Sequence, residues 1–157
     1  MVCIFLADGF EMIEALTPCD ILHRAGLDVR LASVSGKEFV RSTHGVDVKT
    51  DLPLCNLDPD AVDMMILPGG MPGAKNLYES KPLIELLMRH AEQNKPIGAI
   101  CAAPFILGKR CHTDRHHCDR KHQTKQTLHI PLPPWQYPDL RLRRTIPRCI
   151  RRLSPLL

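Results

Sequence analysis

The chain has 157 residues, of which 44% are hydrophobic and 24% are charged, and its formal net charge is +4. This composition is ordinary for one globular domain, and no apolar run is long enough to cross a bilayer. The opening residues, Met1-Val2-Cys3-Ile4-Phe5-Leu6, show no basic leader and no clear cleavage site, which favours a cytoplasmic protein whose seven cysteines stay reduced.

Strand and helix patterns alternate along the first 110 residues. Continuous apolar runs predict buried parallel strands, which we place at residues 2–7, 28–34, 63–67 and 97–100. Apolar residues at helical spacing predict helices between the first two strands, over 72–79, from Pro82 until Lys95-Pro96 stops the pattern, and after Cys101. Residues 35–60 show turns and short strands instead. This order predicts an α/β fold with a doubly wound, mostly parallel sheet.

Ligand sites in such sheets lie at the carboxyl ends of the strands, where Cys101 is the first candidate. The apolar run IGAI leads into Cys101, and the small residues Ala102 and Ala103 follow it. Small neighbours allow a sharp bend like the nucleophile elbow of hydrolases, and the next helix is expected to lower the thiol pKa below about 8.5. A buried core cysteine explains the same spacing, so the residues alone leave both interpretations open.

Three further segments could complete such a site. Glu14, on the first predicted helix, could point toward the thiol or be a solvated acidic residue near a helix start. The amides of Gly69 and Gly70, after Pro68, could hold an oxyanion or form a plain turn. His44, in a predicted loop, could make a polar contact or lie on the surface. We find no Walker or GxGxxG pattern, and we expect no cofactor and no metal.

The sequence after residue 110 differs in charge and composition. Residues 1–110 carry 11 Lys and Arg against 14 Asp and Glu, a net charge of −3, whereas residues 111–157 carry 10 against 3, a net charge of +7. The second segment has no glycine, six prolines and five histidines, and we expect it to be disordered by itself. We therefore divide the chain into an α/β domain, 1–110, and a basic Pro/His/Arg-rich tail, 111–157.

Three interpretations of the tail stay open. It is out-of-frame sequence joined to a truncated domain, a basic arm for nucleic acid or another acidic surface, or a metal-binding patch. The first is favoured because the change falls inside an expected helix, so we expect no nucleic-acid partner unless the tail is genuine, and no membrane partner. The basic arm would use the arginines Arg141, Arg143, Arg144, Arg148, Arg151 and Arg152. The metal-binding patch would use the potential zinc ligands Cys111, His112, His116, His117, Cys118 and His122.

Three motifs, in order along the chain, resemble the ThiJ/PfpI superfamily and, within it, the DJ-one-like branch. They are ADGFEMIEALTPCDILHRAG at 7–26, MMILPGGMPGAKNL at 64–77 and GAICAAPFIL at 98–107. The resemblance covers residues 1–110. It implies a flavodoxin-like sheet, which is also the fold of class I glutamine amidotransferases, in proteins that are usually homodimers.

The resemblance also implies roles for single residues. The elbow cysteine of the family falls on Cys101, its helix glutamate on Glu14, and its amides near the thiol on Gly69 and Gly70, with the elbow amide at Ala102. The family continues with more strands and a histidine that partners the cysteine. Residues 111–157 match none of this, so we assign that role to no tail histidine and expect a truncated sheet.

Described relatives act as cofactor-independent glyoxalases, as deglycases or as oxidation-sensing chaperones. The resemblance therefore implies a cysteine-dependent hydrolase of the glyoxalase or deglycase type, acting on methylglyoxal-like dicarbonyls or their adducts. The alternatives are an oxidation-sensing chaperone without turnover and an inactive, truncated member of the family. Enzymatic activity is expected only if the fold is complete.

Overall fold

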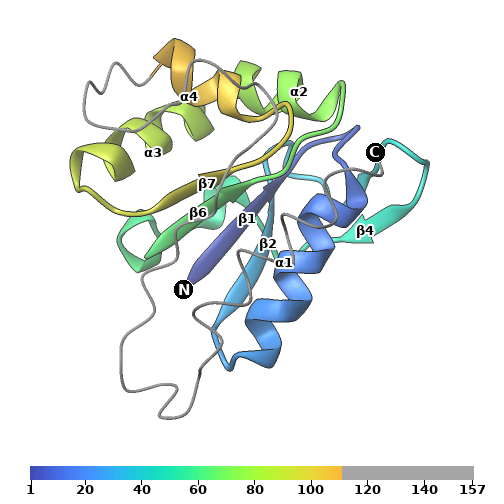
Figure 1. Ribbon diagram of the computed structural model, residues 1–157, viewed down its shortest axis with the longest axis horizontal. Coiled ribbons are helices and arrows are strands. Elements are labelled where there is room, and N and C mark those ends of the chain that lie inside the picture. Colours follow the sequence, from blue (N-terminus) through green and yellow to red (C-terminus); the bar gives the residue numbers. More distant parts are fainter. Residues whose placement is uncertain (111–157) are drawn as a thin grey trace, which may run out of the picture.

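The computed structural model describes residues 1–110 as a twisted sheet with helices on both faces (Figure 1). The tail interpretations fall on residues 111–157, which lie outside the described residues. The strands are β1 (Val2–Leu6), β2 (Val29–Ser33), β3 (Phe39–Arg41), β4 (Asp47–Lys49), β5 (Leu52–Pro53), β6 (Met64–Leu67) and β7 (Ile97–Ala99). The helices are α1 (Met12–Arg24), α2 (Gly73–Glu79), α3 (Lys81–Glu92) and α4 (Pro104–Arg110), with short 3-10 turns at Leu54–Asn56 and Pro59–Ala61.

The central sheet has the order β5-β2-β1-β6-β7, and all four of its strand pairs are parallel. β3 and β4 form a separate antiparallel hairpin. The mostly parallel sheet with flanking helices is therefore confirmed. The sequence did not indicate that β5 joins this sheet, because a strand of two residues is too short to show any periodicity.

The central strand β1 is buried at all five positions, because the sheet is covered on both faces. Val2, Ile4 and Leu6 pack into the apolar cluster beneath α1, while Cys3 and Phe5 point into the cluster beneath α2 and α3. Figure 1 shows α1 on one side of the sheet and α2, α3 and α4 on the other. Burial on both faces is the reason that β1 reads as a continuous apolar run and not as an alternating one.

Two loops at the carboxyl edge of the sheet pack backbone against backbone. The Gly73 amide, at the start of α2, donates a 3.0 Å hydrogen bond to the Gly9 carbonyl, which follows β1. A Cβ on Gly73 would lie 2.5 Å from the Phe10 nitrogen and 2.6 Å from the Gly9 carbonyl carbon. Only a residue without a side chain fits this contact, and the contact sets the spacing of the loops that build the site.

The described residues contain neither a membrane-spanning helix nor a cluster of metal ligands. Between residues 1 and 110, no helix has the length and apolarity that a membrane span requires. In the same range, no three His, Cys, Asp or Glu side chains gather in a way that could hold a metal ion.

A pair of glycine substitutions tests the importance of this loop contact. We expect Gly73→Ala to lower the free energy of unfolding by about 1–3 kcal/mol, because the added methyl meets rigid backbone. Gly108→Ala in α4 is the matched control: its methyl meets nothing within 4 Å, and alanine favours the helix by about 0.5–1 kcal/mol. Urea denaturation of the full chain measures both changes, and equal stability of the two variants would contradict the packing described.

Candidate active site

The candidate site lies where three neighbouring parallel strands end at the same edge of the sheet. β1, β6 and β7 are adjacent in the order of the sheet. The loops that follow them carry Gly9, Gly69 and Cys101, and the structure brings these loops into backbone contact. The Ile100 amide donates to the Leu67 carbonyl at 3.2 Å and thereby holds the end of β7 against β6. The sheet thus delivers the thiol beside the glycine loop.

Cys101 stands in a strained turn between β7 and α4. Its φ angle is +58°, in the left-handed region that non-glycine residues adopt at a cost of about 1–2 kcal/mol. The turn closes through a 3.0 Å hydrogen bond from the Ala103 amide to the Ile100 carbonyl. Cys101 itself is exposed, whereas Ala103 is buried beneath it. This is the geometry of an elbow that presents a side chain at the rim of the sheet.

Gly69 provides the space in which Glu14 and Cys101 meet. The Gly69 amide donates a 2.8 Å hydrogen bond to Glu14 Oε2, which reaches across from α1. A Cβ on Gly69 would lie 2.7 Å from that oxygen, 2.8 Å from the Cys101 Cβ and 2.9 Å from the Ala102 nitrogen. A side chain at this position would therefore displace the glutamate, the elbow or both.

The pKa of the Cys101 thiol is raised above its ordinary value. Desolvation of the sulfur by the surrounding loops is the largest cause, although the residue as a whole is exposed, followed by the charge of Glu14 and a hydrogen bond to that carboxylate; backbone hydrogen bonds from Gly70 and Ala102 oppose the shift. The expected lowering of the thiol pKa by the following helix is therefore wrong. α4 begins only at Pro104, and the nearby carboxylate together with desolvation outweighs the amides.

The two loop glycines have different roles in this geometry. Gly69 uses its amide to hold Glu14, while the backbone of Gly70 faces the sulfur together with that of Ala102. Gly70 has a φ angle of +87°, and a Cβ there would lie 2.5 Å from the Glu11 nitrogen. The donors beside the thiol are thus Gly70 and Ala102, and Gly69 positions the carboxylate.

His44 lies in the turn of the β3–β4 hairpin and faces Glu11. Its Nδ1 is 3.7 Å from Glu11 Oε1, and its side chain is largely exposed. Among the interactions found within residues 1–110, the His44 ring pairs with this carboxylate and not with the thiol. A polar contact of His44 with a substrate stays a prediction.

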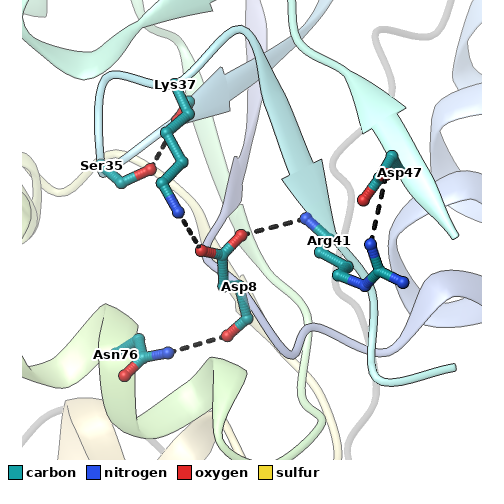
Figure 2. Close-up of polar contacts among 7 residues, drawn as sticks. Asp8, Ser35, Lys37, Arg41, Asp47 and Asn76 are labelled. Carbon is teal, nitrogen blue, oxygen red and sulfur yellow. Dashed lines mark hydrogen bonds and ion pairs between the residues drawn. The ribbon is translucent and has the colours of Figure 1, made fainter. Parts of the chain in front are cut away.

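Asp8 joins the hairpin to the end of β1. Its carboxylate accepts hydrogen bonds from Lys37 Nζ at 2.6 Å and from the Arg41 amide at 3.0 Å, and Asn76 Nδ2 donates to its carbonyl at 2.8 Å (Figure 2). These donors, with the Lys37 hydrogen bond first, lower the pKa of Asp8. Asp8 therefore stays ionised and ties three segments together below the site.

A cavity of about 540 Å³ opens between the loop that follows β1, which carries Asp8, and the β3–β4 hairpin. Charged side chains from Asp8, Lys37 and Arg41 line one part of it, and Met71 and Pro72 line another. Neither Cys101 nor Glu14 is among the lining residues, so the cavity adjoins the glycine loop and does not contain the thiol.

Sequence reasoning marked the segment that begins at Gly9 as one that follows a strand, but it assigned no role to the residues that fix these loops. Gly9 and Gly73 are glycines that close backbone contact demands, and their positions after a strand and before a helix were the available signal. Thr43, whose hydroxyl donates to the Gly9 carbonyl at 2.7 Å, gave no signal, because one threonine in a turn has no pattern.

The arrangement offers three chemical functions within one small volume. Cys101 brings an exposed thiol, Glu14 brings a carboxylate that accepts the thiol hydrogen bond, and the backbone of Gly70 and Ala102 brings hydrogen-bond donors. Nucleophile, base and preformed donors are the elements of nucleophilic catalysis at a carbonyl carbon.

A profile of the DJ-1/PfpI family matches residues 1–129, and the chain therefore belongs to that family. The match extends beyond residue 110, where we placed the end of the resemblance. Protein dj-1beta of Drosophila melanogaster is 36% identical over 106 residues, which are 68% of this chain and 57% of that protein. A deglycase of Thermococcus kodakarensis is 36% identical over 108 residues, which are 68% of this chain and 63% of the deglycase.

Solved structures show the same similarity. The structure described as Toxoplasma gondii DJ-1, oxidized, aligns with a TM-score of 0.68 and 40% identity, over 70% of this chain and 60% of the other. The chain thus spans less than two thirds of the length of each of these relatives.

Alkylation of Cys101 against pH tests the electrostatics of the site. We expect the midpoint for Cys101 to lie above about 8.5, because desolvation and Glu14 disfavour the thiolate. In Glu14→Gln the midpoint should fall, since the substitution removes the negative charge. Peptide mass spectrometry of the iodoacetamide-treated chain resolves Cys101 from the other cysteines. A wild-type alkylation midpoint below about 8.5 would contradict this description, and so would a midpoint that is the same in the wild type and in Glu14→Gln.

Proposed function

We propose that this protein is a cysteine-dependent hydrolase of the glyoxalase or deglycase type, which acts on methylglyoxal-like dicarbonyls or their adducts. The observation that carries this function is the meeting of Cys101, Glu14 and the Gly69-Gly70 loop at one sheet edge. Family membership and a relative named a deglycase support it. A small dicarbonyl or glycated substrate, and a homodimer as the working form, are part of the same hypothesis.

The first step would be the addition of the thiol to an aldehyde. The sulfur attacks the aldehyde carbon of methylglyoxal, an S–C bond forms, and the carbonyl π electrons move to oxygen. Because the thiol pKa is raised, the sulfur starts protonated at neutral pH, and Glu14 accepts its proton as the bond forms. Amide donors at Gly70 and Ala102 stabilise the oxyanion, which takes up a proton to give a hemithioacetal.

The later steps convert the hemithioacetal to a hydroxy acid. A proton leaves the former aldehyde carbon and one is added to the former ketone carbon, while the hydroxyl proton passes from the former aldehyde oxygen to the former ketone oxygen. The hemithioacetal thereby becomes a thioester without net oxidation. Water then cleaves the S–C bond, releases lactate and restores the thiol. The sum is methylglyoxal plus water to lactic acid, so no external oxidant, reductant or cofactor enters. For an adduct, the thiol would instead displace the bound amine or thiol: the new S–C bond forms, the bond from carbon to the leaving nitrogen or sulfur breaks, the thiol proton goes to the leaving group, and the same hemithioacetal results.

A second candidate function is oxidation sensing with a chaperone role. The exposed Cys101 favours it, because an accessible thiol can be oxidised to sulfenic and then sulfinic acid, and one similar structure is described as oxidized. The raised pKa of Cys101 counts against it, since the thiolate is the reactive form. Peroxide treatment separates the two: selective oxygen addition to Cys101 with altered client binding supports the sensor, and its absence removes it.

Substitution of the nucleophile tests the proposed turnover. In the full chain, Cys101→Ser should reduce lactate formation from methylglyoxal more than about 100-fold, because serine is a far weaker nucleophile here. Cys55→Ser is the matched control, as Cys55 is also exposed but lies in a 3-10 turn away from the glycine loop. Lactate is followed by proton NMR.

Two outcomes would contradict the proposed function. Undiminished lactate formation by Cys101→Ser would exclude Cys101 as the nucleophile. A wild-type chain that unfolds cooperatively but forms no lactate would leave the sensor or an inactive family member as the function.

A further inference from the structure

Thr43 joins the β3–β4 hairpin to the loops around the thiol through its side chain. Its hydroxyl donates to the Gly9 carbonyl at 2.7 Å, and the Met71 carbonyl lies 3.4 Å from the same oxygen. The hydroxyl has a single hydrogen, and the Gly9 carbonyl is the nearer of the two acceptors, so it is the main acceptor. That carbonyl also accepts the Gly73 amide at 3.0 Å. Donors from two different loops therefore fix the orientation of one peptide group.

The Gly9 peptide in turn packs directly on Gly70. A Cβ on Gly70 would lie 2.7 Å from the Gly9 oxygen and 2.8 Å from the Phe10 carbonyl carbon. The neighbouring Gly69 is equally close to the elbow, with its added Cβ only 2.8 Å from the Cys101 Cβ. Glycine-on-glycine contacts thus run from the Thr43 hydroxyl to the elbow, with no flexible side chain between them to absorb a shift.

We propose that Thr43 is a positioning residue of the site, which holds the Gly9 carbonyl so that the Gly70 amide stays directed at the Cys101 sulfur. The role proposed for Thr43 concerns the surroundings of the thiol. It rests on the proposed function only in the experiment that measures turnover. Thr43 touches neither the sulfur nor a reacting atom, so it acts through Gly9 and Gly70.

The hydroxyl is not needed to dock the hairpin itself. Backbone hydrogen bonds already join the two segments, from the Gly9 amide to the Arg41 carbonyl at 2.7 Å and from the Thr43 amide to the Phe10 carbonyl at 2.9 Å. Thr43 is exposed and lines the cavity of about 540 Å³, so the methyl group of valine has room there. Thr43→Val is therefore expected to fold with the hairpin in place and to lose only the side-chain hydrogen bond.

The hairpin offers a matched control at its other end. Thr50 Oγ1 also donates to a backbone carbonyl, that of Glu38 at 3.1 Å, with the Lys37 carbonyl at 3.3 Å, and both acceptors lie in the segment before β3. Thr50→Val thus removes a hydroxyl-to-carbonyl hydrogen bond of the same kind, at a more buried position, without touching the connection through Gly9 to Cys101. Thr43→Ser keeps the hydroxyl and is the rescue variant, while Thr43→Ala is a second variant without it.

The measurement is the pH dependence of Cys101 alkylation in the full chain. The Gly70 amide favours the thiolate, so loosening it in Thr43→Val should raise the alkylation midpoint by about half a pH unit. Glu14 is the ionisable side chain that acts on this thiol, and none of these variants alters it. Thr43→Ala should show the same rise, and Thr43→Ser and Thr50→Val should keep the wild-type midpoint.

Turnover supplies a second readout. With methylglyoxal as the substrate, kcat of Thr43→Val should fall about three- to tenfold while KM stays within about twofold, because the donors act on the developing charge. Wild-type midpoints in both Thr43→Val and Thr43→Ala would overturn the assignment, as would an equal shift in Thr50→Val. If the wild-type chain shows no turnover, only the proposed function is contradicted, because the alkylation midpoints test the role of Thr43 independently.

Discussion

The hydrogen bond from the Gly69 amide to the Glu14 carboxylate links the end of β6 to α1, across 55 residues of sequence. Hydrogen bonds to a charged group contribute about 1.5–3 kcal/mol, more than neutral ones, so this bond helps to define where the two elements meet. It forms only because residue 69 has no side chain, since a Cβ would overlap the carboxylate and the elbow. The packing of the parallel sheet thus brings three strand ends together, and one glycine lets them touch.

The same contact sets the electrostatic state of the thiol. Glu14 lies close enough to raise the pKa of Cys101, while the backbone of Gly70 and Ala102 works in the opposite direction. A protonated thiol beside a carboxylate acceptor suits a reaction in which the proton moves as sulfur attacks. It suits rapid oxidation at neutral pH less well, because oxidants react with the thiolate. The balance between one carboxylate and two amides therefore bears on which of the two proposed functions the site favours.

The sequence was sufficient for elements that bury many apolar residues. β1 and β6 are continuous apolar runs, and Cys101, Glu14 and Gly69 each follow a strand that the pattern identified. The place of β5 in the sheet was not predicted, because a strand of two residues shows no periodicity. The direction of the Cys101 pKa shift was predicted wrongly, since it depends on desolvation and on where Glu14 points, which only the folded chain decides. The connection through Thr43 and Gly9 likewise exists only in three dimensions.

The most direct test of the Gly69 contact is a double substitution cycle read by Cys101 alkylation. Gly69→Ala should displace Glu14 and lower the alkylation midpoint of Cys101, and adding Glu14→Gln to it should produce little further change, because the carboxylate has already left the thiol. Circular dichroism and cooperative unfolding confirm that each variant folds. If Gly69→Ala keeps the wild-type midpoint, or if Glu14→Gln shifts it by the same amount in both backgrounds, then the glycine does not control the approach of the carboxylate.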